Sequence, residues 1–279
     1  MAELAGCPGA FGRQWHAAPH RRGLPLGRHH RCRGLGENLR FAFHSGVTMT
    51  SAPLQRLPEA VLRGYRELLT FDSATCALSD CMGRFGGMAA DLRPLSDAIR
   101  FAGTAVTART LASDLAAVFK AIDVSEPGDV VVVDAHGSRD TAFWGENMTI
   151  SAQNRGVAGA VIDGACRDVV EIRRLKFPLF SKGVVPNVAA IAGYGEVNVR
   201  IQCAGQAVAP GDVIVADENG VVVVPAAAAE DLLQRTRRLL ETEHVLQERL
   251  KGGATIGELV EIDKVFASTF DYQSRALEK

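Results

Sequence analysis

The sequence predicts an α/β fold: a single domain with a partly parallel central sheet, preceded by a disordered leader. Residues 130–133 are four consecutive valines, and an apolar run without polar alternation indicates a strand covered on both faces, as in a parallel sheet. Asn219-Gly220 stands between two valine-rich runs, which is the strongest short-range signal for an antiparallel hairpin. Segments with helical periodicity alternate with these strands. We therefore expect parallel and antiparallel pairing in the same domain.

Composition limits the classes of function. The chain has 279 residues, 47% of them hydrophobic, so it can bury a sizeable core. Its net charge is −1, and the folded part lacks the basic stripe with interleaved aromatics that a nucleic-acid-binding domain carries. No apolar run reaches the roughly 18 residues of a membrane span. The six cysteines form no C-x-x-C pair, which suits reduced thiols and predicts a cytoplasmic protein.

Residues 1–48 are expected to form a disordered basic leader. This segment is rich in Gly, Arg, His and Pro and lacks apolar periodicity. A transit peptide is a weaker alternative because serine is almost absent and no amphipathic face is evident. A metal-binding histidine cluster and a translation start at Met49 are two others, although the irregular histidine spacing favours a solvated tail. The predicted division is therefore a leader at 1–48, an α/β domain at 49–253 and a C-terminal tail at 254–279.

Four elements are predicted before the valine run. Apolar residues at helical spacing predict a helix over 57–69, where Pro58 suits the first turn. A second helix over 76–82 ends at Gly83. Residues 101–110 are β-branched and partly alternating, which indicates a strand. Residues 113–122 then place their apolar side chains on one helical face.

A Pro-Gly-Asp-Val turn leads into two of the predicted strands. Pro127-Gly128-Asp129 precedes the strand at 130–133, and the same three residues return at 210–212 before the hairpin strands 213–216 and 221–224. This echo is too short to prove a duplication. Residues 226–251 then read as one long helix with leucines on its inner face, ended by Gly252-Gly253.

The stretch from Trp144 to Asp168 concentrates the groups able to do chemistry. We predict a helix over 148–154 and a strand over 158–162, followed by Asp163, Gly164 and then Arg167-Asp168. In open α/β sheets ligands bind beyond the carboxyl ends of the strands. Arg167 offers a planar fork for a carboxylate, and Asp168 offers a hard oxygen ligand for Mg²⁺ or Mn²⁺. The alternative is an ordinary exposed ion pair.

Each of the other polar residues of this region has a functional and a purely structural interpretation. Residues 145–148 could cradle a carboxylate with the backbone N–H groups of a helix N-terminus, or simply start a helix. Asp134 and Asp163 can equally well just end their strands. His136 is more simply a packed or solvated loop residue than a general base. Cys166 beside Arg167 could have a lowered pKa, but no Cys/His/Asn spacing supports a nucleophile.

Several motifs together carry a family resemblance. They are G-D-V-V-V-V-D, W-G-E-N, R-G-V-A-G-A-V-I-D-G-A-C-R-D-V-V-E-I, F-P-L-F and P-G-D-V-I-V-A-D-E-N-G-V-V-V-V-P. From about Thr75 to Gly253 the chain resembles the regulator-of-ribonuclease-activity A-like family, which includes class II 4-hydroxy-4-methyl-2-oxoglutarate and 4-carboxy-4-hydroxy-2-oxoadipate aldolases. The resemblance implies a swivelling-type β/β/α domain. It also implies trimers or dimers of trimers with active sites between subunits.

The resemblance assigns roles to matching residues. Arg167 matches the family's substrate-binding arginine, and Asp168 matches its metal ligand for a divalent cation, Mg²⁺ or Mn²⁺. Glu243 on the long helix matches, more loosely, an acid that reaches a neighbouring subunit's site. The family's substrate-cradling loop corresponds to Gly145, Glu146, Asn147 and Met148. Within that loop, Glu146 falls where the family often has an acid contacting water on the metal.

The function implied by the resemblance is that of a metal-dependent lyase. Its substrate would be a small 2-keto acid, cleaved to pyruvate and a second keto acid, with oxaloacetate decarboxylation as a side activity. The alternative is a non-catalytic oligomeric regulator of an RNA-processing enzyme. Family members that inhibit a ribonuclease tend to lose the metal-binding aspartate, which this chain keeps as Asp168. A methyltransferase is disfavoured because D-A-H-G-S-R-D after Val133 supplies no G-x-G turn.

Overall fold

The structure is a computed structural model that describes residues 48–49, 54–97, 99–111 and 113–267. The leader predicted over 1–48 lies outside the described residues except for Thr48. The predicted C-terminal tail begins within them. There, α7 (Ile256–Leu259) is closed at its N-terminus by a capping box between Thr255 and Glu258.

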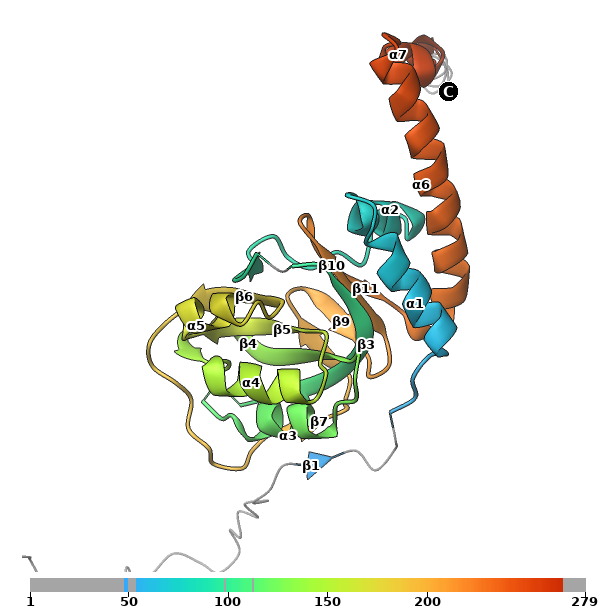
Figure 1. The fold of residues 1–279 in the computed structure, drawn as a ribbon. Coiled ribbons are helices and arrows are strands. Elements are labelled where there is room, and N and C mark those ends of the chain that lie inside the picture. Colours follow the sequence, from blue (N-terminus) through green and yellow to red (C-terminus); the bar gives the residue numbers. More distant parts are fainter. Residues whose placement is uncertain (1–47, 50–53, 98, 112, 268–279) are drawn as a thin grey trace, which may run out of the picture. The chain divides into compact units, whose positions relative to one another are not determined.

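The central sheet is mixed, as predicted (Figure 1). Its main path runs β1-β7-β3-β4-β5-β6-β2, and β10 and β11 join through β3. The pairs β3–β4, β4–β5 and β5–β6 are parallel, whereas β10 pairs antiparallel with both β3 and β11. The strands are β1 (Thr48–Met49), β2 (Arg93–Pro94), β3 (Phe101–Arg109), β4 (Val130–Ala142), β5 (Gly159–Cys166), β6 (Leu179–Val184), β7 (Glu196–Val197), β8 (Ile201–Cys203), β9 (Gln206–Val208), β10 (Val213–Asp217) and β11 (Gly220–Val224).

Helices cover two layers of strands that are joined through β3. The helices are α1 (Glu59–Leu68), α2 (Ala74–Cys81), α3 (Ala116–Val124), α4 (Glu146–Asn154), α5 (Val169–Arg174), α6 (Ala229–Lys251) and α7. Buried residues of α3, α4 and α5 share a core with one face of β4 and β5. Buried residues of α1, α2 and α6 pack instead on β10 and β11. A third core fills the space between these two strand layers. The predicted β/β/α fold class is thereby confirmed.

The valine runs are buried on both faces because each faces two different cores. Along β10, Val213 and Val215 point to the core with α1, α2 and α6, whereas Ile214 points to the core between the strand layers. Alternation of side chains across a strand gives this division directly. The Asn219-Gly220 turn joins β10 to β11 in antiparallel register, as predicted.

The repeated Pro-Gly-Asp turn has a local explanation. Gly128 and Gly211 have φ angles of 88° and 93°, in the left-handed region that glycine adopts without a Cβ penalty. In each turn the aspartate carboxylate accepts the N–H three residues earlier: Asp129 from Glu126 and Asp212 from Ala209, both at 2.8 Å. The two Pro-Gly-Asp motifs therefore share the same turn geometry and hydrogen bond, and their similarity is no sign of a duplication.

The two strands before the candidate site are longer than predicted. β4 continues to Ala142 and β5 to Cys166, so Asp134 and Asp163 do not end their strands but pair with each other inside the sheet. Both carboxylates are buried. They can stay within a strand because backbone N–H groups from β8 and the residue after it satisfy them: Gln202 at 3.4 Å for Asp134 and Ala204 at 2.6 Å for Asp163.

The observed ends of two helices also differ from the predicted ones. α3 starts at Ala116 rather than Ser113 and continues to Val124. α6 begins at Ala229, after a short 3-10 turn over Ala226–Ala228. Its buried side chains end at Leu240, so Leu246 and Leu250, predicted to face inward, are only partly buried.

Candidate active site

The turn after β4 lies directly against the end of β5. Phe143 donates its N–H to the carbonyl of Ala165 at 2.8 Å, and the carbonyl of Trp144 accepts the N–H of Arg167 at 3.0 Å. The Trp144 ring is fully buried and stacks on Phe177, with ring centroids 5.9 Å apart. This packing fixes the turn that leads into α4 beside the turn that leads into α5.

Gly145 is required here because a Cβ atom would not fit between the two turns. A Cβ atom there would lie 2.5 Å from Oδ2 of Asp168 and 3.3 Å from Cγ of Arg167, well inside van der Waals contact. The φ of Gly145 is −161°, which is extended backbone open to any residue. The glycine therefore serves the close approach of the two turns rather than an unusual conformation.

Asp168 links the two turns. It has a φ of 58°, in the left-handed region, and it precedes the first residue of α5. Its Oδ2 accepts the N–H of Glu146, the first residue of α4, at 3.0 Å. Gly145 has no side chain with which to cap α4, so a carboxylate from the neighbouring turn takes that place. The second oxygen, Oδ1, is then the one available to a cation.

Arg167 presents its guanidinium beside this carboxylate. Its Nε lies 3.5 Å from Oδ2 of Asp168, and its side chain is 37% exposed. Among the described residues, neither terminal nitrogen of Arg167 has a hydrogen-bond or ion-pair partner. A planar fork with free N–H donors matches the geometry of a carboxylate.

The structure brings together only some of the predicted site residues. Glu146 is half-buried and Asn147 is exposed at the start of α4. The Met148 side chain is buried in the core beneath α4, so only its backbone could contact a ligand. Glu243 lies elsewhere in the same chain, on α6, where it lines a small cavity with Thr70, Asp72 and other residues around the turn between α1 and α2.

Cys166 and His136 have no catalytic environment. Burial raises the pKa of the Cys166 thiol to about 12, so the lowered pKa considered from sequence is wrong. His136 has an exposed side chain with Nδ1 3.5 Å from Oδ1 of Asp134, which agrees with a solvated position.

One ion pair between neighbouring strands of the sheet was not anticipated from the sequence. Nζ of Lys182, on β6, lies 2.8 Å from Oδ1 of Asp163, on β5, and only 14% of the Lys182 side chain is exposed. Burial lowers the pKa of Lys182, but the hydrogen bond and charge of Asp163, together with the charges of Asp91 and Cys203, raise it, so its pKa lies above the ordinary value. The two residues are on different strands, and their local sequence carries no signal of the pairing.

No multidentate metal cluster is present in the part of the chain that the structure describes: nowhere do three His, Cys, Asp or Glu side chains converge as metal ligands. A cation at the candidate site would therefore depend on the single carboxylate of Asp168 and on water. None of the described helices is long and apolar enough to cross a membrane.

Comparison with known proteins places these features in a family. The RraA-like family, described as Aldolase/RraA, matches residues 75–223. A Halalkalibacterium halodurans protein, whose name proposes it as a 4-hydroxy-4-methyl-2-oxoglutarate aldolase, is 35% identical over 164 residues, covering 59% of this chain and 78% of the relative.

Two solved structures are similar throughout their length. An uncharacterized protein from Pseudomonas syringae pv. tomato superposes with a TM-score of 0.64 at 29% identity, over 75% of this chain and 97% of that one. The RNA-processing inhibitor RraA from Thermus thermophilis superposes with a TM-score of 0.51 at 34% identity, over 54% and 92%. Because the family match spans more than half of the sequence and includes both turns of the candidate site, this chain belongs to the RraA-like family.

Proposed function

We propose that the protein is a divalent-metal-dependent lyase. It cleaves 4-hydroxy-2-keto diacids of the 4-hydroxy-4-methyl-2-oxoglutarate type to pyruvate and a second keto acid, and it decarboxylates oxaloacetate as a side activity. The observation that carries this proposal is the contact of Asp168 and Arg167 with the Gly145-Glu146 turn. The name of the Halalkalibacterium relative supports the same reaction class.

The residues present fit a weakly chelated hard cation. Asp168 is partly exposed, and one of its oxygens is already used by the Glu146 N–H, which leaves a single carboxylate oxygen for the ion. Mg²⁺ commonly keeps several waters and takes only one or two protein carboxylates, and Mn²⁺ accepts the same oxygen ligands. When bound, the ion would supply Lewis-acid polarisation of the 2-keto oxygen.

Arg167 binds and stabilises the pyruvyl half of the substrate in this proposal. Its fork holds the 1-carboxylate, which fixes the C3–C4 bond for cleavage. As that bond breaks, its electron pair moves to C3 and the keto oxygen of C2 becomes an enolate. A fixed guanidinium beside this developing charge lowers the barrier without reorganising.

Glu146 positions the water that accepts a proton from the substrate. A water held by its carboxylate accepts the proton of the C4 hydroxyl, and C4 becomes the keto carbon of the second product. The enolate then takes a proton at C3 and leaves as pyruvate. Oxaloacetate reaches the same enolate by losing CO₂, so a single site would support both activities.

A non-catalytic regulator of an RNA-processing enzyme is the second candidate. It is favoured by the likeness to the Thermus RNA-processing inhibitor. Such a role needs a particular outer surface rather than a metal ligand, and Asp168 is the residue on which the two functions differ.

Assay of the purified full-length chain separates the candidates. With Mg²⁺ and a panel of branched 4-hydroxy-2-keto acids, we expect pyruvate release that a chelator abolishes and added Mg²⁺ restores. Asp168→Asn keeps an oxygen acceptor for the Glu146 N–H and should fold normally without activity, whereas Asp168→Ala should also lose about 1 kcal/mol of stability. Wild-type rates in Asp168→Asn, or no turnover of any substrate together with inhibition of a ribonuclease, would reject the lyase proposal.

A further inference from the structure

Thr149 connects the buried core to a peptide group at the centre of the candidate site. It lies one turn into α4 and is fully buried. Its hydroxyl accepts the indole N–H of Trp144 at 2.9 Å and donates to the carbonyl of Gly145 at 3.0 Å. An indole nitrogen can only donate, so the single hydroxyl proton of Thr149 is free for Gly145. The direction of both hydrogen bonds is thereby fixed.

The carbonyl that Thr149 contacts belongs to the same peptide group as the N–H that contacts Asp168. The carbonyl of Gly145 and the N–H of Glu146 lie on opposite edges of one planar trans peptide. That N–H donates to Oδ2 of Asp168 at 3.0 Å. Any rotation of this peptide plane therefore changes the hydrogen bond to Asp168. Gly145 has no side chain that would restrict the rotation, so its orientation depends on the hydrogen bonds at its two edges.

A threonine inside a helix often bonds the carbonyl four residues earlier without any further role. The N–H of Thr149 also donates to the carbonyl of Gly145, at 3.0 Å, as in any helix. The indole of Trp144 adds a second partner that holds the hydroxyl in one orientation. The hydrogen bonds then run in one direction from the indole to the hydroxyl, the peptide group and the carboxylate of Asp168, so each strengthens the next.

We propose that Thr149 is a positioning residue for Asp168. Its hydroxyl, oriented by Trp144, sets the plane of the Gly145-Glu146 peptide, and this plane keeps Oδ2 of Asp168 bonded so that Oδ1 is the oxygen left for a cation. The catalytic consequence rests on the proposed lyase function. The orientation of the peptide does not, and it can be measured without metal or substrate.

Loss of the Thr149 hydroxyl should lower kcat more than it changes KM. The main-chain N–H of Arg167 is bonded to the carbonyl of Trp144, which belongs to a different peptide group, so the carboxylate clamp stays in place. A displaced Asp168 acts instead on the reacting end of the substrate. In Thr149→Val we expect kcat to fall on the order of 10-fold to 100-fold, with KM at saturating Mg²⁺ close to the wild-type value.

A second pair of variants separates positioning from stability. Thr149→Val leaves the indole of Trp144 buried without an acceptor, which destabilises the fold by itself. In a Trp144→Phe background no indole remains, so adding Thr149→Val removes only the hydrogen bond to Gly145. We expect this addition to lower kcat again, whereas Thr149→Ser, which keeps the hydroxyl, should retain wild-type kcat. The Trp144→Phe pair decides the question even if Thr149→Val alone does not fold.

Hydrogen exchange of the Glu146 amide tests the peptide orientation without turnover. It is followed by NMR on the metal-free full-length chain, relative to amides of β4 in the same sample, which corrects for overall stability. We expect exchange about 5-fold faster in Thr149→Val, the factor that corresponds to one typical hydrogen bond. Thr149→Ser should exchange as the wild type does. Titration with Mn²⁺, followed by electron paramagnetic resonance, should show weaker binding in Thr149→Val only.

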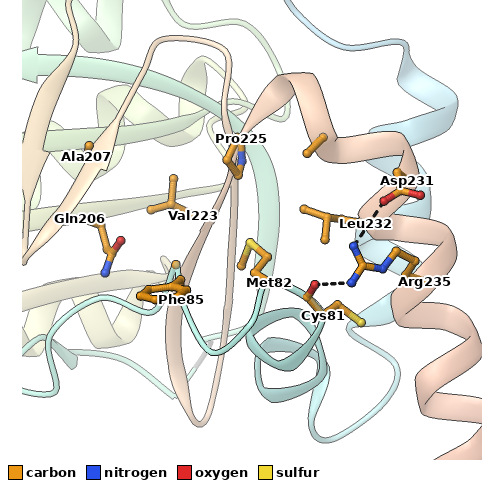
Figure 2. A pocket seen from close by; sticks show the side chains of 12 residues that line it. Cys81, Met82, Phe85, Gln206, Ala207, Val223, Pro225, Asp231, Leu232 and Arg235 are labelled. Atoms are coloured by element: carbon orange, nitrogen blue, oxygen red, sulfur yellow. Dashed lines mark hydrogen bonds and ion pairs between the residues drawn. The ribbon is translucent and has the colours of Figure 1, made fainter.

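Two control variants remove a side-chain bond to a backbone carbonyl elsewhere. Thr107 on β3 is fully buried and donates to the carbonyl of Val199 at 2.6 Å, so Thr107→Val is the buried match. Figure 2 shows Arg235 of α6 donating to the carbonyl of Cys81, at 2.7 Å, beside a groove of about 530 Å³ lined by α2, the loop after it, β9, β11 and the start of α6. Thr107→Val and Arg235→Met should keep wild-type kcat and wild-type exchange at Glu146.

The outcomes distinguish this inference from the proposed function. A wild-type chain that releases no pyruvate from any substrate would reject the lyase, and Glu146 exchange would then decide the role of Thr149 alone. Wild-type kcat in Thr149→Val, an equal loss in Thr149→Ser, or unchanged Glu146 exchange would overturn the inference while leaving the lyase in place.

Discussion

At the scale of single residues, Asp168 has a structural role beside its proposed chemical one. Its Oδ2 caps α4 by accepting the Glu146 N–H, and its left-handed backbone starts α5. A carboxylate at a helix N-terminus is stabilised by the positive end of the helix dipole. Asp168 therefore contributes to stability as well as to the proposed metal binding, which is why the asparagine variant is the cleaner test of metal binding.

Arg167→Lys separates a substrate clamp from a surface ion pair. Lysine keeps the positive charge but loses the two-point geometry of the guanidinium, and losing one preorganised donor typically costs on the order of 100-fold in rate. We expect kcat/KM to fall by about this factor for aldol cleavage and for oxaloacetate decarboxylation alike, because both pass through one enolate. Steady-state kinetics with the two substrates measures the change. Loss of only one activity would show that Arg167 contacts the departing half of the substrate.

Burial of Cys166 predicts a pH dependence of stability. Burial raises its pKa from 9.0 to about 12 in the folded chain, so above pH 9 the thiol ionises in the unfolded chain but not in the folded one. The unfolded state is then favoured, and stability falls as the pH rises towards 12, by at most about 1.4 kcal/mol per pH unit from this group.

Urea denaturation at pH 8 and pH 10.5 checks this sign. The midpoint of the wild type should fall more steeply with pH than that of Cys166→Ala, which lacks the thiol. Other buried groups whose pKa is raised, such as Cys203 and Tyr65, are common to both proteins and cancel in the comparison. Equal slopes would mean that the Cys166 thiol reaches water in the folded chain.

At the scale of elements, the candidate site depends on two turns that lie too close together to leave room for a side chain at Gly145. The turn into α4 and the turn into α5 are connected through Trp144, Arg167 and Asp168, and Gly145 leaves the room for this contact. The proposed chemistry thus depends on contacts between these two turns, not on a cluster of metal ligands on one element.

Gly145→Ala tests that dependence. The new methyl group would stand 2.5 Å from Oδ2 of Asp168, so the carboxylate must move away from α4, and a displacement of this size can cost about 100-fold in rate. We expect a folded protein with greatly reduced kcat/KM. Gly87→Ala is the control, because a Cβ atom there meets nothing within 4 Å. Full activity in Gly145→Ala would mean that the two turns separate freely.

At the scale of the whole molecule, the structure separates Glu243 from the other residues of the proposed site. Arg167 and Asp168 lie at the start of α5, whereas Glu243 lies on α6 near the turn between α1 and α2. We propose Glu243 of a second copy as the acid that the family resemblance implies at this site.

Mixing of inactive subunits tests the role of Glu243. If it acts across a subunit boundary, Glu243→Gln and Arg167→Lys should each have strongly reduced activity, and a mixture unfolded and refolded together should regain part of the wild-type activity. Recovery arises because some sites then combine an intact Arg167 with an intact Glu243. A Glu243→Gln protein with wild-type kcat/KM would remove this acid from the mechanism.

The sequence by itself determined the fold class and the position of the candidate site. The valine run at 130–133 and the Asn219-Gly220 turn report local burial and local turn geometry, which the side chains encode directly. Arg167-Asp168 follows a strand and a turn, and this order placed the candidate site, because loops that follow parallel strands meet at one edge of a sheet.

Only the tertiary structure decided which groups meet. Asp163 continues within β5 because Lys182 and the Ala204 N–H, both distant in sequence, satisfy its charge, and Cys166 has a raised pKa because three helices bury that face of the strand. The approach of Gly145 to Asp168 depends in the same way on contacts between remote segments. Periodicity shows that a residue is buried, but the partner that it meets is set by how the elements pack.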